Sequence, residues 1–243
     1  MTGTSGARAA VTGALITGTL LVAHAGPGIT AIGPLRGRLF PRLAGRGDPR
    51  HVALTFDDGP DPCHTPPLLA LLAGHRARAT FFLLGERVAA APGLVADITD
   101  AGHEVAVHGW DHRYTILTRP SVTCDGMARA RDAIAAASGT VPRWYRPPYG
   151  VLSRSSLTAA RRLALTPVLW SCWGREWVPG ATPESVHRVL TAGLAPGGTV
   201  LLHDSDCTSP AGSAAAARGA LPRLLADCAA RGLTVGPLCE HGL

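Results

Sequence analysis

The stretch HVALTFDDGP, residues 51–60, joins a short apolar run to a pair of acids and a sharp turn. The run over 51–56 contains valine, threonine and phenylalanine and ends before Gly59-Pro60, which predicts a strand followed by a turn. Six further runs of this kind follow, alternating with Ala-, Leu- and Arg-rich stretches of helical character. The predicted strands are 51–56, 79–84, 103–107, 143–146, 166–171, 198–203 and 233–237. The predicted helices are 65–75, 86–100, 121–137, 153–164, 182–194 and 213–231.

This alternation is typical of an α/β fold in which helices cover parallel strands. Seven strands over this length favour a closed or nearly closed β/α barrel with helices outside. An open doubly wound sheet is the alternative, but the early chain lacks the Gly-x-Gly-x-x-Gly turn of a dinucleotide site. The 243 residues, of which 46% are hydrophobic, suffice for one such core.

Residues 1–50 differ in composition, which leaves 51–243 as the domain that carries the chemistry. Arg8 precedes an apolar stretch over 9–25 that ends in a small-x-small sequence, as at a signal-peptide cleavage site. A cleaved signal peptide and an uncleaved anchor both fit, and a cytosolic chain with an unusual N-terminal helix is the alternative. We expect a membrane-anchored or secreted protein, with residues 41–49 as a linker.

The composition argues against some partners and sites. The net charge is +6 and all 23 basic residues are arginine. These arginines are scattered singly and in pairs without interleaved aromatic residues, which argues against nucleic acid as a partner. None of the six cysteines forms a C-x-x-C pair, which argues against a structural zinc knuckle. Disulfides and free thiols in the core both remain open.

Polar residues follow five of the seven predicted strands. They are Asp57 with Asp58, His108 with His112, Arg146 with Tyr149, Glu176 with Trp177, and His203 with Asp204. The C-terminal ends of the strands of a β/α barrel meet on one face, and that face carries the chemistry. We therefore expect these residues to form one site.

The stretch His108-Gly-Trp-Asp-His112 spaces two histidines four residues apart, so that both could bind one metal from a helical turn. A carboxylate from the Asp57-Asp58 pair would complete a site with open positions for water and substrate. Gly109 stands where the H-E-x-x-H zinc proteases need glutamate. An Fe(II) oxygenase could use a similar triad, but the barrel-like pattern argues against that class. Taken alone, the Asp57-Asp58 pair could be an acidic turn in which Asp58 caps a helix, or a phosphoryl-transfer site, and the two histidines could be unrelated surface residues.

Two further stretches carry candidate residues. The two prolines of Arg146-Pro-Pro-Tyr-Gly150 predict a rigid, extended segment. Such a segment could hold Arg146 beside a carboxylate and present the backbone N–H of Tyr149 to a developing oxyanion. Leu201-Leu-His203 places a histidine at the mouth of the barrel.

Four motifs in this order, TFDDGP (55–60), HGWDH (108–112), RPPYG (146–150) and LLHD (201–204), resemble the polysaccharide deacetylase family with the NodB homology domain, carbohydrate esterase family 4. The resemblance covers about residues 50–240. It implies a distorted β/α barrel and a divalent metal held by Asp58, His108 and His112. The ligand types favour Zn²⁺, with Co²⁺, Ni²⁺, Mn²⁺ and Fe²⁺ as alternatives.

The resemblance also implies roles for four other residues. Asp57 would be the general base, oriented by Arg146. The Tyr149 backbone N–H would bind the oxyanion, and His203 would be the general acid that protonates the departing amine. Trp177 and Leu201 are predicted to form a small pocket for the acetyl methyl group.

This sequence departs from the family pattern at three positions. Gly109 stands where the family usually has serine or threonine. The fourth motif, usually Asp-x-x-Asp-Trp, is Trp173-Gly-Arg-Glu176-Trp177. Glu176 keeps the second acid, so we predict that it contacts His203 and raises the pKa of the imidazole. Trp173 replaces the first acid.

The predicted function is metal-dependent hydrolysis of N-acetyl groups on an amino-sugar polymer or oligomer, peptidoglycan or chitin-like, by a monomer that releases acetate. One alternative is a metal-dependent amidase or esterase for a small molecule, for which long capping loops would be expected in place of an open groove. A second is an inactive carbohydrate-binding domain at the cell surface. The second is disfavoured because Asp57, Asp58, His108, His112 and His203 are all present.

Overall fold

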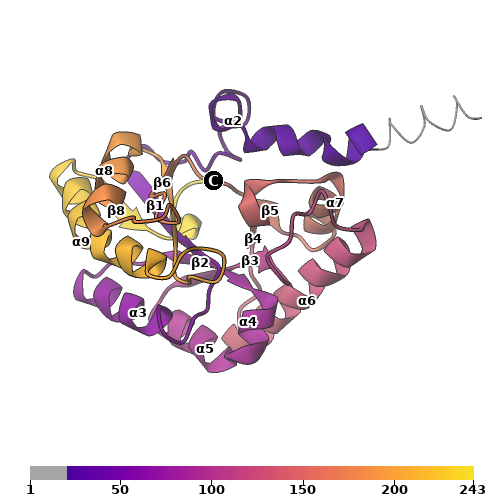
Figure 1. Cartoon of the computed structure of the whole chain (residues 1–243), viewed down its shortest axis with the longest axis horizontal. Helices are drawn as coiled ribbons and strands as arrows, with labels where there is room; N and C mark the ends of the chain where they lie inside the picture. Colours follow the sequence, from indigo (N-terminus) through magenta and orange to yellow (C-terminus); the bar gives the residue numbers. More distant parts are fainter. Residues whose placement is uncertain (1–20) are drawn as a thin grey trace, which may run out of the picture.

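The computed structural model describes residues 21–243, which form one curled sheet with helices around it (Figure 1). The strands are β1 (His51–Asp57), β2 (Thr80–Leu84), β3 (Glu104–Gly109), β4 (Trp144–Tyr145), β5 (Thr166–Pro167), β6 (Cys172–Trp173), β7 (Thr199–His203) and β8 (Thr234–Gly236). Every ladder is parallel, in the order β5-β4-β3-β2-β1-β7-β6, and β8 pairs with the first half of β1. The predicted distorted β/α barrel is confirmed.

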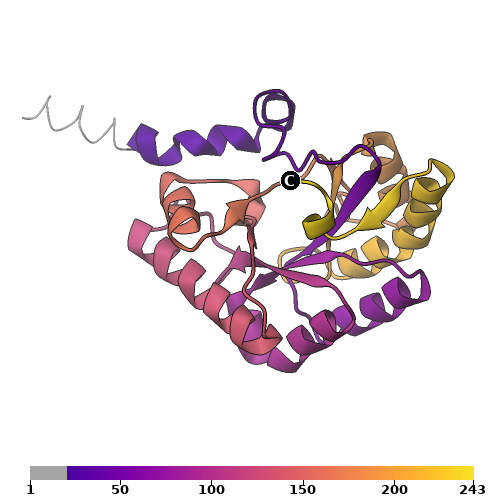
Figure 2. The same ribbon diagram turned by 180° about the vertical axis from the view of Figure 1, so that it is seen from behind.

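Helices surround the sheet on three sides, and the N-terminal segment lies along the fourth (Figures 1 and 2). The helices are α2 (Gly33–Leu39), α3 (Thr65–Gly74), α4 (Gly85–Ala90), α5 (Pro92–Asp100), α6 (Pro120–Ser138), α7 (Arg154–Arg162), α8 (Pro183–Gly193) and α9 (Ser213–Ala230). Three short 3₁₀ turns are η1 (Gly26–Ala31), η2 (Pro148–Gly150) and η3 (Leu238–Glu240).

Local sequence explains where several helices begin and end. Ser153 and Thr182 cap α7 and α8, each side chain accepting a hydrogen bond from the backbone N–H three residues on. Gly139 ends α6 in the left-handed conformation that glycine adopts without strain. The single helix predicted over 86–100 is wrong: it is two helices, because Pro92 cannot continue α4 but is well placed as the first residue of α5.

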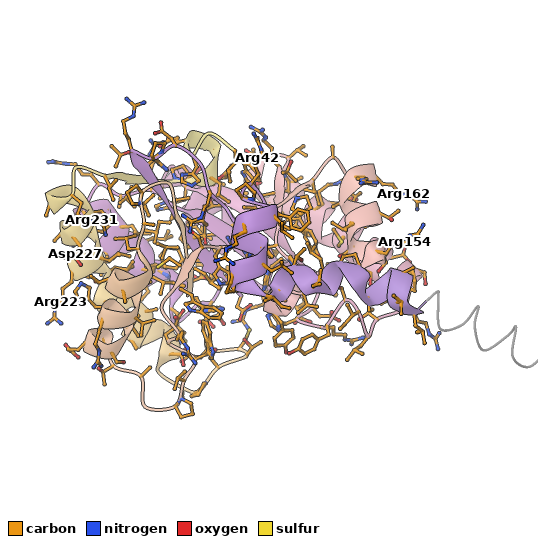
Figure 3. All side chains as sticks on the ribbon, turned by 90° about the horizontal axis from the view of Figure 1, so that it is seen from above. Arg42, Arg154, Arg162, Arg223, Asp227 and Arg231 are labelled. Carbon is orange, nitrogen blue, oxygen red and sulfur yellow. The ribbon has the colours of Figure 1, made fainter. Side chains whose placement is uncertain are left out.

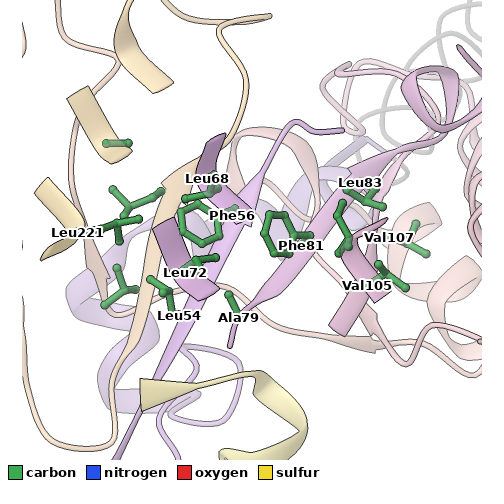
Figure 4. Packing of buried hydrophobic residues seen from close by; sticks show 14 of the residues in the cluster. Leu54, Phe56, Leu68, Leu72, Ala79, Phe81, Leu83, Val105, Val107 and Leu221 are labelled. Carbon is green, nitrogen blue, oxygen red and sulfur yellow. The ribbon is translucent and has the colours of Figure 1, made fainter. Parts of the chain in front are cut away.

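The alternation of β1 builds the core on one face and the site on the other. Val52, Leu54 and Phe56 pack in the large cluster between sheet and helices, where Phe56 stacks on Phe81 at 5.2 Å (Figure 4). Each such fully buried side chain contributes about 1.5–3 kcal/mol. Ala53 instead belongs to the small cluster inside the barrel. Successive side chains of a strand point to opposite faces, so Asp57 also faces the interior, at the mouth.

The fifth predicted strand, 166–171, is wrong as a single element. The first two residues of this run form β5, which pairs with β4 at one edge of the sheet. The residues just after the run form β6, which pairs with β7 at the other edge. Between them the chain crosses the gap, with Val168 N–H donating to Tyr145 and Leu169 N–H donating to Leu43. The strand ladders therefore stop short of closing the barrel.

Residues 41–49, predicted as a linker, are instead packed into that gap. The Gly47 N–H donates to the Gly197 carbonyl at 3.0 Å, and the Asp48 N–H donates to the His241 carbonyl at 2.8 Å. Gly45 has φ +66°, and any side chain there would collide with Thr199. The segment completes the wall of the barrel where strands are missing. Its Arg- and Gly-rich composition did not predict this role.

Two predictions concern the residues before this segment. Most of the apolar stretch 9–25 lies outside the described residues, so the signal or anchor stays a prediction. Among residues 21–243, no helix is long and apolar enough to cross a membrane. Over the same range all six cysteines are free thiols, with Cys172 and Cys228 buried.

Candidate active site

A cavity of about 340 Å³ opens at the C-terminal ends of the strands. Most of the predicted site residues line it: Asp57, His108, His112, Tyr149, Trp177, Leu201 and His203. Asp58, Arg146 and Glu176 are fully buried directly behind this wall. The structure thus brings together residues from five separate strand ends, as expected of a β/α barrel.

Arg146 fixes the carboxylate of Asp57 from inside the barrel. Its Nη1 donates to Asp57 Oδ1 at 2.7 Å and to Thr55 Oγ1 at 2.8 Å, while its other nitrogens donate to the carbonyls of Val168 and Leu169. The guanidinium is wholly buried, and the carboxylate of Asp57 is the acidic group with which it forms an ion pair. Burial lowers the pKa of Arg146, and Asp57 opposes that effect. Asp57 Oδ2 is the oxygen that Arg146 leaves available to a proton.

Asp58, His108 and His112 converge on one point. The Asp58 Oδ1 atom lies 3.3 Å from His108 Nε2 and 3.2 Å from His112 Nε2, and one ligand atom from each residue falls within 4.8 Å of the others. Burial alone would raise the pKa of Asp58, but the nearby histidines, His108 foremost, hold it well below its usual range. Burial lowers the pKa of His112 to about 4, which keeps its imidazole neutral.

The donor set fits a divalent cation. Asp58 Oδ1 is buried without a hydrogen-bond partner among the described residues, although it lies between two imidazoles. His108 Nδ1 is 2.9 Å from the Arg146 carbonyl, which can only accept, so Nδ1 carries the proton and Nε2 offers its lone pair. Two neutral imidazoles and one carboxylate are the ligands of many hydrolytic zinc sites.

The backbone around these histidines differs from the prediction. His108 lies near the end of strand β3 rather than on a helical turn. The loop that follows brings His112 back beside His108, so that both imidazoles face Asp58 Oδ1. Gly109 makes this return possible with φ +126°, a conformation that a serine or threonine could adopt only with strain. The glycine that departs from the family pattern is therefore required by this loop.

The segment 146–150 is only partly extended. Pro147 has extended φ and ψ angles, but Tyr149 is left-handed with φ 58° and turns the chain into η2. Its ring packs edge-on against His112 at 4.3 Å and stacks on Tyr114 at 3.8 Å. These contacts hold a strained residue at the cavity wall, where strain often marks function.

Glu176 and His203 form a buried pair. His203 Nδ1 lies 2.8 Å from Glu176 Oε1, and the glutamate is wholly buried. Burial by itself lowers the pKa of His203, but the bond and charge of Glu176 outweigh it and raise the pKa to about 9. Gly174 leaves room for the longer side chain, because a Cβ there would come within 2.7 Å of Glu176 Oε2.

The Glu176→Gln substitution is expected to lower the pH at which activity falls on the alkaline side by roughly one to three units. A raised pKa keeps His203 protonated until the pH passes about 9, and without the carboxylate, burial favours the neutral imidazole. The measurement is a pH–rate profile of kcat/KM. Glu176→Asp, which keeps the charge, should retain most activity. An unmoved alkaline limb would rule out Glu176 as the partner and make Asp204 the next candidate.

Several lining residues were not predicted from the sequence. Thr208 Oγ1 donates to Asp58 Oδ2 at 2.7 Å and so turns Oδ1 towards the histidines. Trp170 and Tyr114 complete the cavity wall. Thr208 lies five residues beyond His203, in the loop that follows β7. Its closeness in sequence to His203 is the one feature from which its place in the site could have been predicted.

The fold and this arrangement define a hydrolase of the β/α-barrel class, and comparisons with known proteins narrow the class. A family profile described as polysaccharide deacetylase matches residues 44–168. A chitooligosaccharide deacetylase of Bradyrhizobium sp. (strain ANU 289) is 36% identical over 197 residues, which cover 78% of this chain and 89% of that protein.

Two solved structures show the same fold. The Bc1960 peptidoglycan N-acetylglucosamine deacetylase superimposes with a TM-score of 0.77 at 26% identity, covering 86% of this chain and 96% of that one. A family 4 carbohydrate esterase from Streptomyces lividans, in complex with acetate, has a TM-score of 0.68 at 33% identity, covering 76% of this chain and 91% of that one. The chain belongs to the polysaccharide deacetylase family. It is a hydrolase of carbon–nitrogen bonds other than peptide bonds.

Proposed function

We propose that this enzyme hydrolyses the N-acetyl groups of N-acetylglucosamine units in an oligomer or polymer and releases acetate. The observation that carries the proposal is one cavity lined by Asp57 and His203, a proton acceptor and a proton donor, with the Asp58–His108–His112 cluster at the same wall. The names of the relatives, deacetylases of chitooligosaccharide and of peptidoglycan N-acetylglucosamine, support this substrate class.

The residues of the chain divide the proton transfers between them. Asp57 Oδ2 accepts the proton of the attacking water, since Arg146 occupies Oδ1. His203 donates a proton to the departing amine from Nε2, since Glu176 occupies Nδ1. The amine would otherwise be a poor leaving group. The Tyr149 N–H is the proposed oxyanion donor.

Asp58, His108 and His112 would hold the metal, for which we propose Zn²⁺ from the two imidazoles and one carboxylate. When bound, it supplies Lewis acidity towards the water and the acetyl carbonyl. Trp177 and Leu201 flank His203 in the cavity wall, where they would surround the acetyl methyl group. The exposed rings of Tyr114, Tyr149 and Trp173 at the rim suit a chain of sugars.

Acetate release across a panel of substrates tests the proposal. The panel contains chitooligosaccharides, peptidoglycan fragments, O-acetylated xylan and small acetamides, each assayed after chelation and after adding Zn²⁺ back. We expect release from the N-acetylglucosamine substrates only, abolished by chelation and restored by metal. Release confined to O-acetyl groups or to small acetamides would contradict the proposal.

We further propose that the protein is exported, secreted or anchored through its N-terminus. The apolar stretch 9–25 and the absence of acidic residues before Asp48 support this. Fractionation of cells that express the full chain should place it in the membrane or outside the cell. A wholly cytosolic protein with Met1 intact would contradict export.

A further inference from the structure

A second cavity, of about 450 Å³, adjoins the active site and is separated from it by two tryptophans. Trp170 and Trp173 line both cavities, and their rings lie 5.9 Å apart. The remaining walls of the second cavity come from the N-terminal segment, including Arg36 and Arg46. This segment, which includes α2, lies along the side of the barrel that helices α3 to α9 leave uncovered (Figures 1 and 2).

Arg36 is a buried cation without a counter-ion. The residue is 4% exposed, and its guanidinium donates to the carbonyls of Thr30 at 2.9 Å and Trp170 at 2.7 Å. Its Nε is buried without a partner among the described residues. Residues 1–20 contain no acidic residue, so they cannot supply the missing carboxylate. Burial, with a smaller contribution from Arg146, lowers the pKa of Arg36 to about 10, which leaves it charged at neutral pH.

The rest of this cavity is also suited to an anion. Its lining contains a second cation, the exposed Arg46, and no aspartate or glutamate. Within residues 21–243 neither arginine forms an ion pair. Trp173, where the family pattern has an aspartate, leaves the boundary between the cavities without a negative charge.

We propose that this second cavity is a subsite for a carboxylate carried by the sugar unit next to the one being deacetylated. The inference rests on the proposed function. A guanidinium pairs with a carboxylate through two parallel hydrogen bonds, and such pairs gain strength where water is excluded. A purely structural role for Arg36 accounts for its two carbonyl contacts. It does not account for the missing counter-ion of Arg36, since an unpaired buried charge is costly, or for a second unpaired cation, Arg46, in the same cavity.

The occupant follows from the wall that the two cavities share. Trp170 and Trp173 line both cavities, so a glycan with its N-acetyl group in the active site would carry its neighbouring unit across Trp173 to Arg36 and Arg46. The ring of Trp173 is 42% exposed and offers a flat apolar face to a sugar. The subsite would favour glycans whose units bear acidic substituents over neutral ones.

Calorimetric titration of the full chain tests the subsite directly. The probes are an N-acetylglucosamine oligomer whose alternate units bear 3-O-lactyl carboxylates and the same oligomer with those carboxylates converted to amides. We expect the carboxylate form to bind about tenfold more tightly, as for hydrogen bonds to a charged group, and the preference to shrink in high salt. Arg36→Gln and Arg46→Gln should each bring the ratio of the two affinities towards one.

Arg42→Gln is the matched control, because Arg42 belongs to the same segment and is exposed without lining the cavity (Figure 3). It should keep the wild-type preference. Arg46 is exposed, so its substitution tests the charge even if loss of Arg36 loosens α2. Equal affinities in the wild type, or a preference that survives both substitutions, would overturn the subsite. A retained preference without acetate release would overturn only the proposed function.

Discussion

Alanine at any one of Asp58, His108 and His112 is expected to abolish stoichiometric metal binding while the barrel stays folded. Each residue supplies one of three converging ligand atoms, and the site lies at the barrel mouth, away from the packed core. Loss of a residue that only supports a ligand typically costs 10–100-fold in metal affinity, so loss of a ligand should cost more than about 100-fold. Elemental analysis of purified protein, with circular dichroism for folding, measures both quantities.

His75→Ala is the control for these variants. His75 is exposed after α3 and belongs to neither cavity, so its loss should leave the metal content unchanged. Full metal content in all three ligand variants would show that the metal is bound elsewhere. Thr208→Val offers a finer comparison, since it removes only the hydrogen bond to Asp58 Oδ2 and should weaken binding less than loss of the ligand itself.

The Asp57→Asn substitution is expected to abolish turnover while the metal stays bound. Asparagine has the same shape, and its carbonyl oxygen can still accept from Arg146, but it cannot take a proton from water. General-base catalysis contributes roughly 10²–10⁴-fold, so kcat should fall by at least about 100-fold. Acetate release and elemental analysis on the same preparation separate this outcome from metal loss.

Asp204→Asn is the matched control for Asp57→Asn. Asp204 is also buried at the end of a central strand, but its carboxyl accepts from Thr65 and does not line the active-site cavity. Burial raises the pKa of Asp204 to about 7, so a large fraction of this carboxyl is already neutral at neutral pH. A neutral amide should therefore be tolerated at this position. Normal acetate release by Asp57→Asn would remove Asp57 as the base.

Asp57 and Asp58, at the end of β1, show how one strand end supplies two different functions. Asp57 is still in the strand and faces the barrel interior, where Arg146 meets it. Asp58 begins the turn with φ 77°, which directs its carboxylate to the histidines instead. Aspartate tolerates this left-handed conformation better than most residues. One residue along the chain therefore separates proton transfer from metal binding.

The sequence by itself determined the type of fold and the members of the site. Its strand-like and helical runs are local patterns, since period and residue type depend only on near neighbours along the chain. Parallel strands in a barrel place their C-terminal ends on one face, so motifs such as TFDDGP and LLHD could be assigned to one site without coordinates. Even the contact of Glu176 with His203 was predicted, because Glu176 occupies the place of the second acid in the family's fourth motif.

Only the tertiary structure decided where the sheet stays open, which segment fills the opening, and what surrounds the site. The run 166–171 divides between two edges because its partners, β4 and β7, lie at opposite sides of an open sheet, and no local pattern encodes that separation. Residues 43–48 fill the opening because unpaired backbone groups there need partners, although their composition resembles a linker. The same packing buries Arg36 beside Trp170 and creates the second cavity, which depends on contacts more than a hundred residues apart in sequence.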